Sequence, residues 1–337
     1  HDALPIYGSG SFEISNILQY HQVDYLSVAY ADEGIELRKN GITLPIMVMN
    51  PEEQSFDAML KFNLEPEIYS FRILSLFEEA IKRNYKDSNK KGYVHLKLDT
   101  GMHRLGFEKS EIHELIERIK NNTQIEIKSV FSHLAASEDK EQDAFTQNQI
   151  FSFTEMSNLI QTEFSYSILR HILNSAGISR FRDAQFEMVR LGIGLYGVAS
   201  NEQEQSFLKN VSTLKTIISQ IKKIPKGDSI GYGHKWIAPT DMISGTIPIG
   251  YADGLNRKMG NNKGEVFVNG KLAKIIGNIC MDMCMIDLTN IPAKEGDNVI
   301  IFGSEIPISK FAKEMETIPY EVLTNVSRRV KRVYFQE

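Results

Sequence analysis

At 337 residues, the chain is long enough for about two domains with substantial apolar cores. Its formal net charge of −5 comes from interspersed acidic and basic residues, so we expect no basic surface that binds nucleic acid. No apolar run approaches the ~20 residues that span a bilayer, which excludes a membrane-crossing helix at this stage.

The first 200 residues alternate between short β-branched or aromatic runs and longer amphipathic segments. This alternation predicts parallel strands joined by crossover helices. The predicted strands are 25–29, 45–49, 67–71, 93–98, 127–132, 168–173 and 186–191. The predicted helices are 12–21, 32–40, 53–62, 73–83, 111–120 and 143–161. We expect the second helix to end at Asn40-Gly41, where glycine can adopt the left-handed cap conformation.

Polar side chains follow the ends of several of these strands: Lys97, His133, Asn174, Ser175 and Arg190. A barrel assembles its site from the carboxyl ends of many strands, whereas an open sheet concentrates it at one switch point. We therefore predict a (β/α)8 TIM barrel over residues 1–207. Seven predicted strands are one short of eight, so we expect the first strand to lie before Tyr7 and the chain to be truncated at its start.

The alternation with helices stops near residue 208. The predicted strands are then 212–224, 243–249, 265–268, 272–276, 284–288 and 299–302, and only 310–315 is predicted as a helix. Asn269-Gly270 between two apolar runs indicates a two-residue hairpin turn, because both residues can take a positive φ. We predict a separate, mostly antiparallel β domain over residues 208–337.

The two cysteines, Cys280 and Cys284, are typical of a reduced, cytoplasmic compartment. Their spacing could indicate a metal pair, but nearby histidine or further thiol ligands are lacking. We therefore predict two buried free thiols and no metal site.

Two separated signatures resemble those of the alanine racemase family. The first is HLKLDTGMHRLG at residues 95–106, and the second combines TIPIGYADG at 246–254 with GNICMD at 277–282. The chain is most similar to the racemase halves of bifunctional cell-wall enzymes that also carry an amino-terminal ligating half. The resemblance implies a cytoplasmic homodimer that uses pyridoxal 5'-phosphate (PLP) to interconvert L- and D-alanine for peptidoglycan synthesis.

The resemblance places the cofactor at the carboxyl face of the barrel. Arg190 would donate to the pyridine nitrogen of PLP, and because a guanidinium keeps its proton, the ring would remain a weak electron sink. His133 would lie against the ring. The phosphate region would be formed by Tyr7, Asn174, Ser175, Gly192 and Ile193. The alternatives are that Arg190 pairs with a barrel carboxylate, that His133 is a core histidine, and that 174–177 is only a loop.

The substrate residues follow from the same resemblance. Arg104 would meet the substrate carboxylate, held by Lys97 in a carboxylated form; alternatively, Lys97 pairs with Asp99. Tyr232 would be the base on one face of the substrate. The residues expected to enter the partner subunit's site are Tyr232, Tyr251, Met281 and Asp282.

Two positions depart from the family. Arg328 stands where many members have a tyrosine that reaches the phosphate. Ala3 stands four residues before the Tyr-Gly-x-Gly turn, where the family has the lysine that binds PLP covalently and acts as the second base. We therefore expect the polypeptide as written to be inactive or nearly so, and residues 1–6 not to be native.

Two rival functions remain. A decarboxylase could share this barrel-plus-β architecture, but the YADG and CMD runs disfavour it. A non-catalytic PLP-binding homologue would be favoured if the lysine is truly absent.

Overall fold

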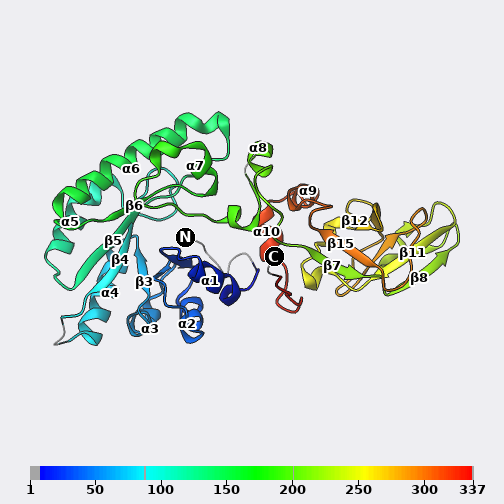
Figure 1. Ribbon diagram of the computed structural model, residues 1–337, viewed down its shortest axis with the longest axis horizontal. Helices are drawn as coiled ribbons and strands as arrows, with labels where there is room; N and C mark the ends of the chain where they lie inside the picture. Colours follow the sequence, from blue (N-terminus) through cyan, green and yellow to red (C-terminus); the bar gives the residue numbers. More distant parts are fainter. Residues whose placement is uncertain (1–7, 87–88, 200, 336–337) are drawn as a thin grey trace. The chain divides into compact units, whose positions relative to one another are not determined.

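The computed structural model describes residues 8–86, 89–199 and 201–335, which fall into two compact units (Figure 1). Within this part of the chain, the first unit holds Gly10–Leu195 and Ala199–Glu204, and the second holds residues 8–9, Tyr196–Val198 and 205–335. No helix of the described residues combines the length and apolarity needed to cross a bilayer.

The first unit is built on a parallel sheet whose six strands follow the chain order. The strands are β1 (Leu26–Val28), β2 (Ile46–Val48), β3 (Glu65–Ile68), β4 (Gly92–Lys97), β5 (Ile125–Phe131) and β6 (Leu169–His171). The main helices are α1 (Ser11–Tyr20), α2 (Ala31–Lys39), α3 (Phe56–Lys61), α4 (Phe71–Asn84), α5 (Ile112–Lys120) and α6 (Asp143–Glu163). Strand–helix alternation with neighbouring parallel strands is the arrangement of a (β/α) barrel, so the predicted fold class of this unit is confirmed.

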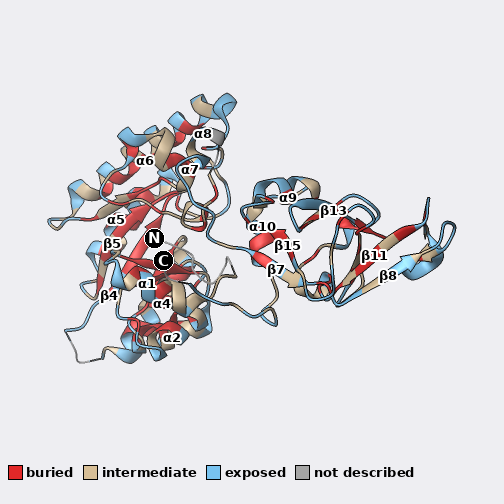
Figure 2. Cartoon of the chain, turned by 45° about the vertical axis from the view of Figure 1, so that its right-hand side comes forward, coloured by how far each residue is buried: buried red, intermediate tan, exposed pale blue. Residues whose placement is uncertain are grey.

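Helix and strand boundaries follow local sequence chemistry. Helix α2 ends where Gly41 takes a φ of 92°, and the N–H of Ile42 donates to Leu37 O at 3.1 Å, as predicted from Asn40-Gly41. At the start of α4, the Ser70 side chain accepts from the N–H of Ile73. Buried residues, red in Figure 2, lie along strands such as β4 and β5 and along the helix faces that cover them.

The seventh predicted strand, 186–191, is not a strand. Phe186 takes a φ of 50°, which breaks an extended conformation at its first residue. The Glu187 carboxylate accepts from the N–H of Arg170 at 2.9 Å and so occupies a donor that a strand partner would use. Met188 N donates to Arg170 O, and Arg190 N donates to Leu173 O just after β6. Residues 186–191 therefore follow β6 as an irregular segment.

The second unit contains a seven-stranded antiparallel sheet in the order β7-β15-β12-β13-β14-β11-β8. The strands are β7 (Leu214–Ile217), β8 (Gln220–Ile224), β11 (Met242–Ile247), β12 (Glu265–Val268), β13 (Lys271–Ile276), β14 (Cys284–Asp287) and β15 (Asn298–Phe302). Asn269 and Gly270 have φ values of 46° and 84° between β12 and β13, so the predicted hairpin turn is confirmed.

Besides an unpredicted two-stranded sheet of β9 (Ser229–Ile230) and β10 (Trp236–Ile237), two details of this unit differ from the prediction. Residues 212–224 form two strands, β7 and β8, which occupy opposite edges of the sheet although only two residues join them. The sheet must therefore curl until its edges approach each other. The second difference is an additional helix, α10 (Pro319–Thr324), after α9 (Ile308–Glu314). Its proline at the first helical position suits a helix start.

Candidate functional site

A buried pair of opposite charges lies at the carboxyl ends of β3 and β4. Glu67 is 2% exposed and Lys97 is 5% exposed. Burial raises the pKa of Glu67 to about 6, opposed by Lys97, Arg190 and Arg104. Burial lowers the pKa of Lys97 to about 8, opposed first by Glu67. Asp99 acts on Lys97 more weakly than Glu67 does.

Asp99 is engaged elsewhere. Its carboxylate accepts from the N–H groups of Gly101 and His103 at 2.9 and 3.0 Å, and so closes the turn after β4. The alternative prediction paired Lys97 with Asp99. In the structure, Glu67 is instead the carboxylate with the larger effect on Lys97. Arg104 is exposed, and its charge acts on Glu67, Lys97 and His133.

Arg190 is buried, and its two terminal nitrogens make five contacts. Nη2 donates to the carbonyls of Ser132 and Ile172 at 2.6 and 3.1 Å and lies 3.2 Å from His133 Nδ1. Nη1 donates to the carbonyl of His171 at 3.2 Å and lies 2.7 Å from His171 Nδ1. Burial lowers the pKa of Arg190 to about 10, against the effect of Glu67. The guanidinium is therefore fixed by carbonyls and imidazoles, and it remains charged at neutral pH.

The His133 ring is half-buried beside this arginine. Burial, followed by the charges of Arg190, Lys97 and Arg104, holds its pKa well below the usual range. A histidine in these surroundings is neutral at neutral pH. The pairing with Arg190 brings the two predicted ring residues together.

Two turns close this region after β6. Ser175 Oγ accepts from the N–H groups of Gly192 and Gly194 at 2.9 and 3.2 Å. Asn174 Oδ1 accepts from the N–H of Gly177 at 2.9 Å and caps α7 (Ser175–Arg180), a helix that the sequence interpretation missed. Ile193 begins the 3-10 turn Ile193–Tyr196. The predicted phosphate residues of 174–175 and 192–193 thus lie in two hydrogen-bonded turns.

The predicted substrate residues of the second unit lie on neighbouring loops. The N–H groups of Tyr251 and Ala252 donate to the carbonyls of Cys280 and Met281 at 3.1 and 3.0 Å. Asn278 Nδ2 donates to the carbonyl of Tyr232 at 2.9 Å. The side chains of Tyr232 and Met281 are 71% and 54% exposed. The unit therefore presents an aromatic and apolar group of side chains at its surface.

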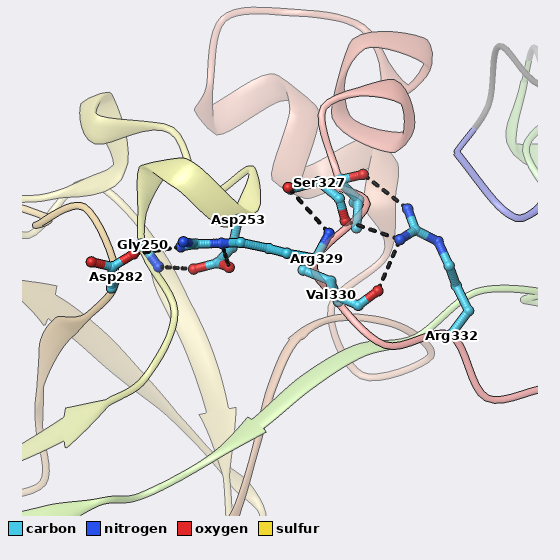
Figure 3. Close-up of polar contacts among 8 residues, drawn as sticks. Gly250, Asp253, Asp282, Ser327, Arg329, Val330 and Arg332 are labelled. Carbon is cyan, nitrogen blue, oxygen red and sulfur yellow. Dashed lines mark hydrogen bonds and ion pairs between the residues drawn. The ribbon is translucent and has the colours of Figure 1, made fainter.

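Ser327 and Arg329, near the end of the described residues, contact the loops that carry Asp253 and Asp282 (Figure 3). Asp253 Oδ2 accepts from the N–H of Gly250 at 2.9 Å, and the carbonyl of Asp253 accepts from Ser327 N at 3.1 Å. Arg329 forms ion pairs with both Asp253 and Asp282. Arg328 and Arg329 are both exposed, and Arg329 is the one that forms the ion pairs with the two loops.

Several residues of this region were missed from sequence. Glu65 and Glu67 alternate along a buried strand, and two acids facing a barrel interior would have been a usable signal. His95, two residues before Lys97, shares its face of β4. Cys284 is buried but Cys280 is only half-buried, which corrects the expectation of two buried thiols. Ala3 and Tyr7 lie outside the described residues.

Comparison with known proteins gives consistent matches to both units. The amino-terminal domain of alanine racemases matches residues 6–200, and the carboxy-terminal domain matches residues 211–334. Alanine racemase 2 of Caldanaerobacter subterraneus is 37% identical over 97% of this chain and 85% of its own length. Alanine racemase of Helicobacter pylori is 38% identical over 97% of this chain and 89% of its own length.

Solved structures agree with these matches. Alanine racemase of Clostridium difficile superposes with a TM-score of 0.91 at 35% identity, over 99% of this chain and 87% of the other. Alanine racemase of Bartonella henselae, described with covalently bound pyridoxal phosphate, gives a TM-score of 0.87 at 29% identity. This superposition covers 99% of this chain and 91% of the Bartonella henselae chain.

Proposed function

Because the chain belongs to the alanine racemase family, we propose that it interconverts L- and D-alanine and supplies D-alanine for peptidoglycan in the cytoplasm. The cofactor of the family is PLP. The observation that carries the proposal is the charge at the carboxyl ends of the barrel strands. Lys97, Arg104 and Arg190 all act there on the buried carboxylate of Glu67.

This donor set fits PLP. The cations of Lys97, Arg104 and Arg190 favour an anionic phosphate and a substrate carboxylate. Arg190 can donate to an unprotonated ring nitrogen, and the neutral His133 ring beside it can lie against an aromatic ring without adding charge. The hydroxyl of Ser175 and the backbone N–H groups of the turn at 192–193 can serve the phosphate. Asn174 supports this turn region as the cap of α7.

When bound, PLP supplies the conjugated ring that stabilises the negative charge left at Cα of alanine after proton removal. Arg190 keeps its own proton at neutral pH, since its pKa is about 10. It therefore donates a hydrogen bond and does not protonate the ring, which limits side reactions such as transamination. Arg104 would pair bidentately with the substrate carboxylate. Tyr232 would remove or return the proton at Cα on one face.

We further propose a homodimer in which Tyr232, Tyr251, Met281 and Asp282 enter the partner subunit's site. Exposed aromatic and methionine side chains are typical of surfaces that become buried on association. Fusion to an amino-terminal ligating half, carboxylation of Lys97 and a boundary between domains at residue 207 remain predictions.

We infer that the second base is missing from the polypeptide as written, because Ala3 stands where the family resemblance expects the lysine. A lysine amine is needed both to bind PLP covalently and to exchange the proton on the other face, and alanine has no titratable group. We propose that Ala3 makes this polypeptide inactive. A non-catalytic PLP-binding protein is the second candidate, and Ala3 is the observation that favours it.

The test compares the chain as written with a version whose residues 1–6 are replaced by the first-strand segment of a curated relative, with lysine at position 3. Both proteins are loaded with PLP and incubated with L-alanine in D₂O. We expect D-alanine and deuterium at Cα only in the second protein. A folded, PLP-loaded second protein that forms neither product would contradict the racemase proposal and support the non-catalytic alternative.

A further inference from the structure

A continuous hydrogen-bonded chain runs through the interior of the first unit and ends at Arg190. Glu65 Oε2 lies 2.8 Å from His95 Nε2, and His95 Nδ1 lies 2.6 Å from Ser129 Oγ. Ser129 Oγ lies 2.8 Å from His171 Nε2, and His171 Nδ1 lies 2.7 Å from Arg190 Nη1. All five residues are buried, and they come from β3, β4, β5, β6 and the segment after β6.

The two end residues of this hydrogen-bonded series, Glu65 and Arg190, determine where each proton lies. Arg190 can only donate, so His171 Nδ1 must accept and its proton must sit on Nε2. Ser129 then accepts from His171 Nε2 and donates to His95 Nδ1, which places the His95 proton on Nε2, facing Glu65. A carboxylate can only accept, so every donor in the chain has an acceptor with this single arrangement.

Neighbouring groups hold this arrangement. Phe131 stacks on His171 with ring centroids 4.8 Å apart and an interplanar angle of 2°, so the imidazole plane is fixed. Burial and the charge of Arg190 keep the pKa of His171 well below its usual range, which keeps the ring neutral. Tyr25 adds a hydrogen bond to Glu65 at the far end.

We propose that Glu65, His95, Ser129 and His171 form a directed hydrogen-bond relay that positions Arg190 toward the ring nitrogen of PLP, an inference that rests on the proposed role of Arg190. The four residues are positioning residues, since they act through Arg190. Glu65 fixes at the far end the same proton order that Arg190 requires at the near end. With a neutral group in its place, the protons could shift to the opposite order, and His171 would present Nδ1–H to a guanidinium that also only donates.

Stability alone does not account for the relay. Replacing buried charged groups by well-packed apolar side chains is often neutral or stabilising, so a buried carboxylate is weak evidence for a stabilising role. The orientation of a donor at a catalytic site, in contrast, requires fixed partners for the donor. The relay supplies such a partner at Nη1, while carbonyls fix Nη2.

The first measurement is the tautomer of His171 and His95 in the full chain labelled with ¹⁵N-histidine, by long-range ¹H–¹⁵N spectra at neutral pH. We expect both rings to be neutral and protonated at Nε2. In Glu65→Gln, the amide can either accept or donate, so we expect the two His171 nitrogen signals to move toward each other as both tautomers become populated. Glu65→Asp retains the charge and should retain the single tautomer.

Ser27→Ala is the matched control for Ser129→Ala. Ser27 is also a buried strand serine, and within the described residues its hydroxyl has no hydrogen-bond partner. We expect Ser129→Ala, but not Ser27→Ala, to shift the histidine signals. If Glu65→Gln and Ser129→Ala fold and leave both tautomers unchanged, the relay is refuted.

The second measurement is the absorption spectrum of PLP bound to the same proteins. We expect Glu65→Gln to shift it in the same direction as Arg190→Leu and by a smaller amount. A shift with Arg190→Leu but none with Glu65→Gln would overturn the positioning role. Altered tautomers together with an unchanged spectrum in both variants would refute the proposed role of Arg190 at the ring, and with it the positioning of Arg190 toward PLP.

Discussion

Asp253 and Asp282, on two separate loops, are bridged by one arginine. Arg329 Nε donates to Asp253 Oδ1 and Nη2 donates to Asp282 Oδ1, each over 2.7 Å (Figure 3). These two hydrogen bonds raise the pKa of Arg329 above its usual value. Tyr251 lies beside Asp253 in the first loop, and Met281 lies beside Asp282 in the second. The bridge therefore fixes the relative position of two loops that we propose contact the substrate in the partner subunit.

We predict that Arg329→Gln raises the KM for alanine several-fold in the lysine-restored protein and changes the melting temperature little. Exposed ion pairs contribute little to stability, but the bridge holds loop geometry. The control is Lys331→Gln, which removes a nearby exposed positive charge and should leave KM unchanged. Equal KM values for the two variants would show that the bridge does not position the loops.

The sequence predicted features that depend on local chemistry. The hairpin at Asn269-Gly270 and the end of α2 at Gly41 each depend on a few neighbouring residues with a special φ, and both are confirmed. The parallel and antiparallel units followed from periodicity and are confirmed. The strand expected at 186–191 fails because the Glu187 side chain occupies the N–H of Arg170, a tertiary contact that no local pattern reports.

The candidate site, like the fold, could be predicted only in part from the sequence. Arg190, His133 and Lys97 could be proposed because each stood at or just beyond the end of a predicted strand and the family resemblance gave each a role. The relay could not, because it links five segments through interior side chains, and a hydrogen bond such as Ser129 to His171 depends on the register of β5 against β6. Glu67 was missed because its effect on Lys97 arises only when β3 and β4 are adjacent.

Glu67 and Lys97 should give opposite pH dependences of stability. The pKa of Glu67 rises on folding from 4.5 to about 6, so the free energy of unfolding should fall as pH rises through this window, by up to roughly 2 kcal/mol. The pKa of Lys97 falls on folding from 10.5 to about 8, so stability should be lost as pH falls from 10.5 through 8.

Denaturant unfolding at several pH values tests this pair. Subtracting the Glu67→Gln curve from the wild-type curve should isolate the acidic window, and subtracting the Lys97→Met curve should isolate the alkaline one. Because the two charges interact, Lys97→Met should also move the acidic window to higher pH. Parallel pH profiles for all three proteins would contradict the assigned shifts.

Arg190→Leu should alter the absorption of bound PLP and raise the ratio of transamination to racemisation in the lysine-restored protein. Leucine removes the donor that we place at the ring nitrogen, and it leaves the carbonyls of Ser132 and Ile172 without their arginine partner. Buried groups left unpaired typically cost about 1–3 kcal/mol each, so stability must be measured alongside. An unchanged spectrum and product ratio in a folded, PLP-loaded protein would exclude the ring-nitrogen role.

Tyr232→Phe should reduce racemisation by ~10²–10⁴-fold without releasing the cofactor, the usual effect of losing a positioned acid–base group. Its exposure of 71% in its own chain fits a side chain that acts on the partner subunit.

The sharing of sites between subunits can be tested by mixing Tyr232→Phe subunits with Arg190→Leu subunits, both in the lysine-restored protein. One site of each mixed dimer would then combine an intact Arg190 with an intact Tyr232 from the other chain. Random mixing in equal amounts should recover about a quarter of wild-type activity, since half of the dimers are mixed and each has one intact site. If Tyr232 acted within its own chain, every site would lack one of the two groups, and mixing would give only the average of the two parent dimers.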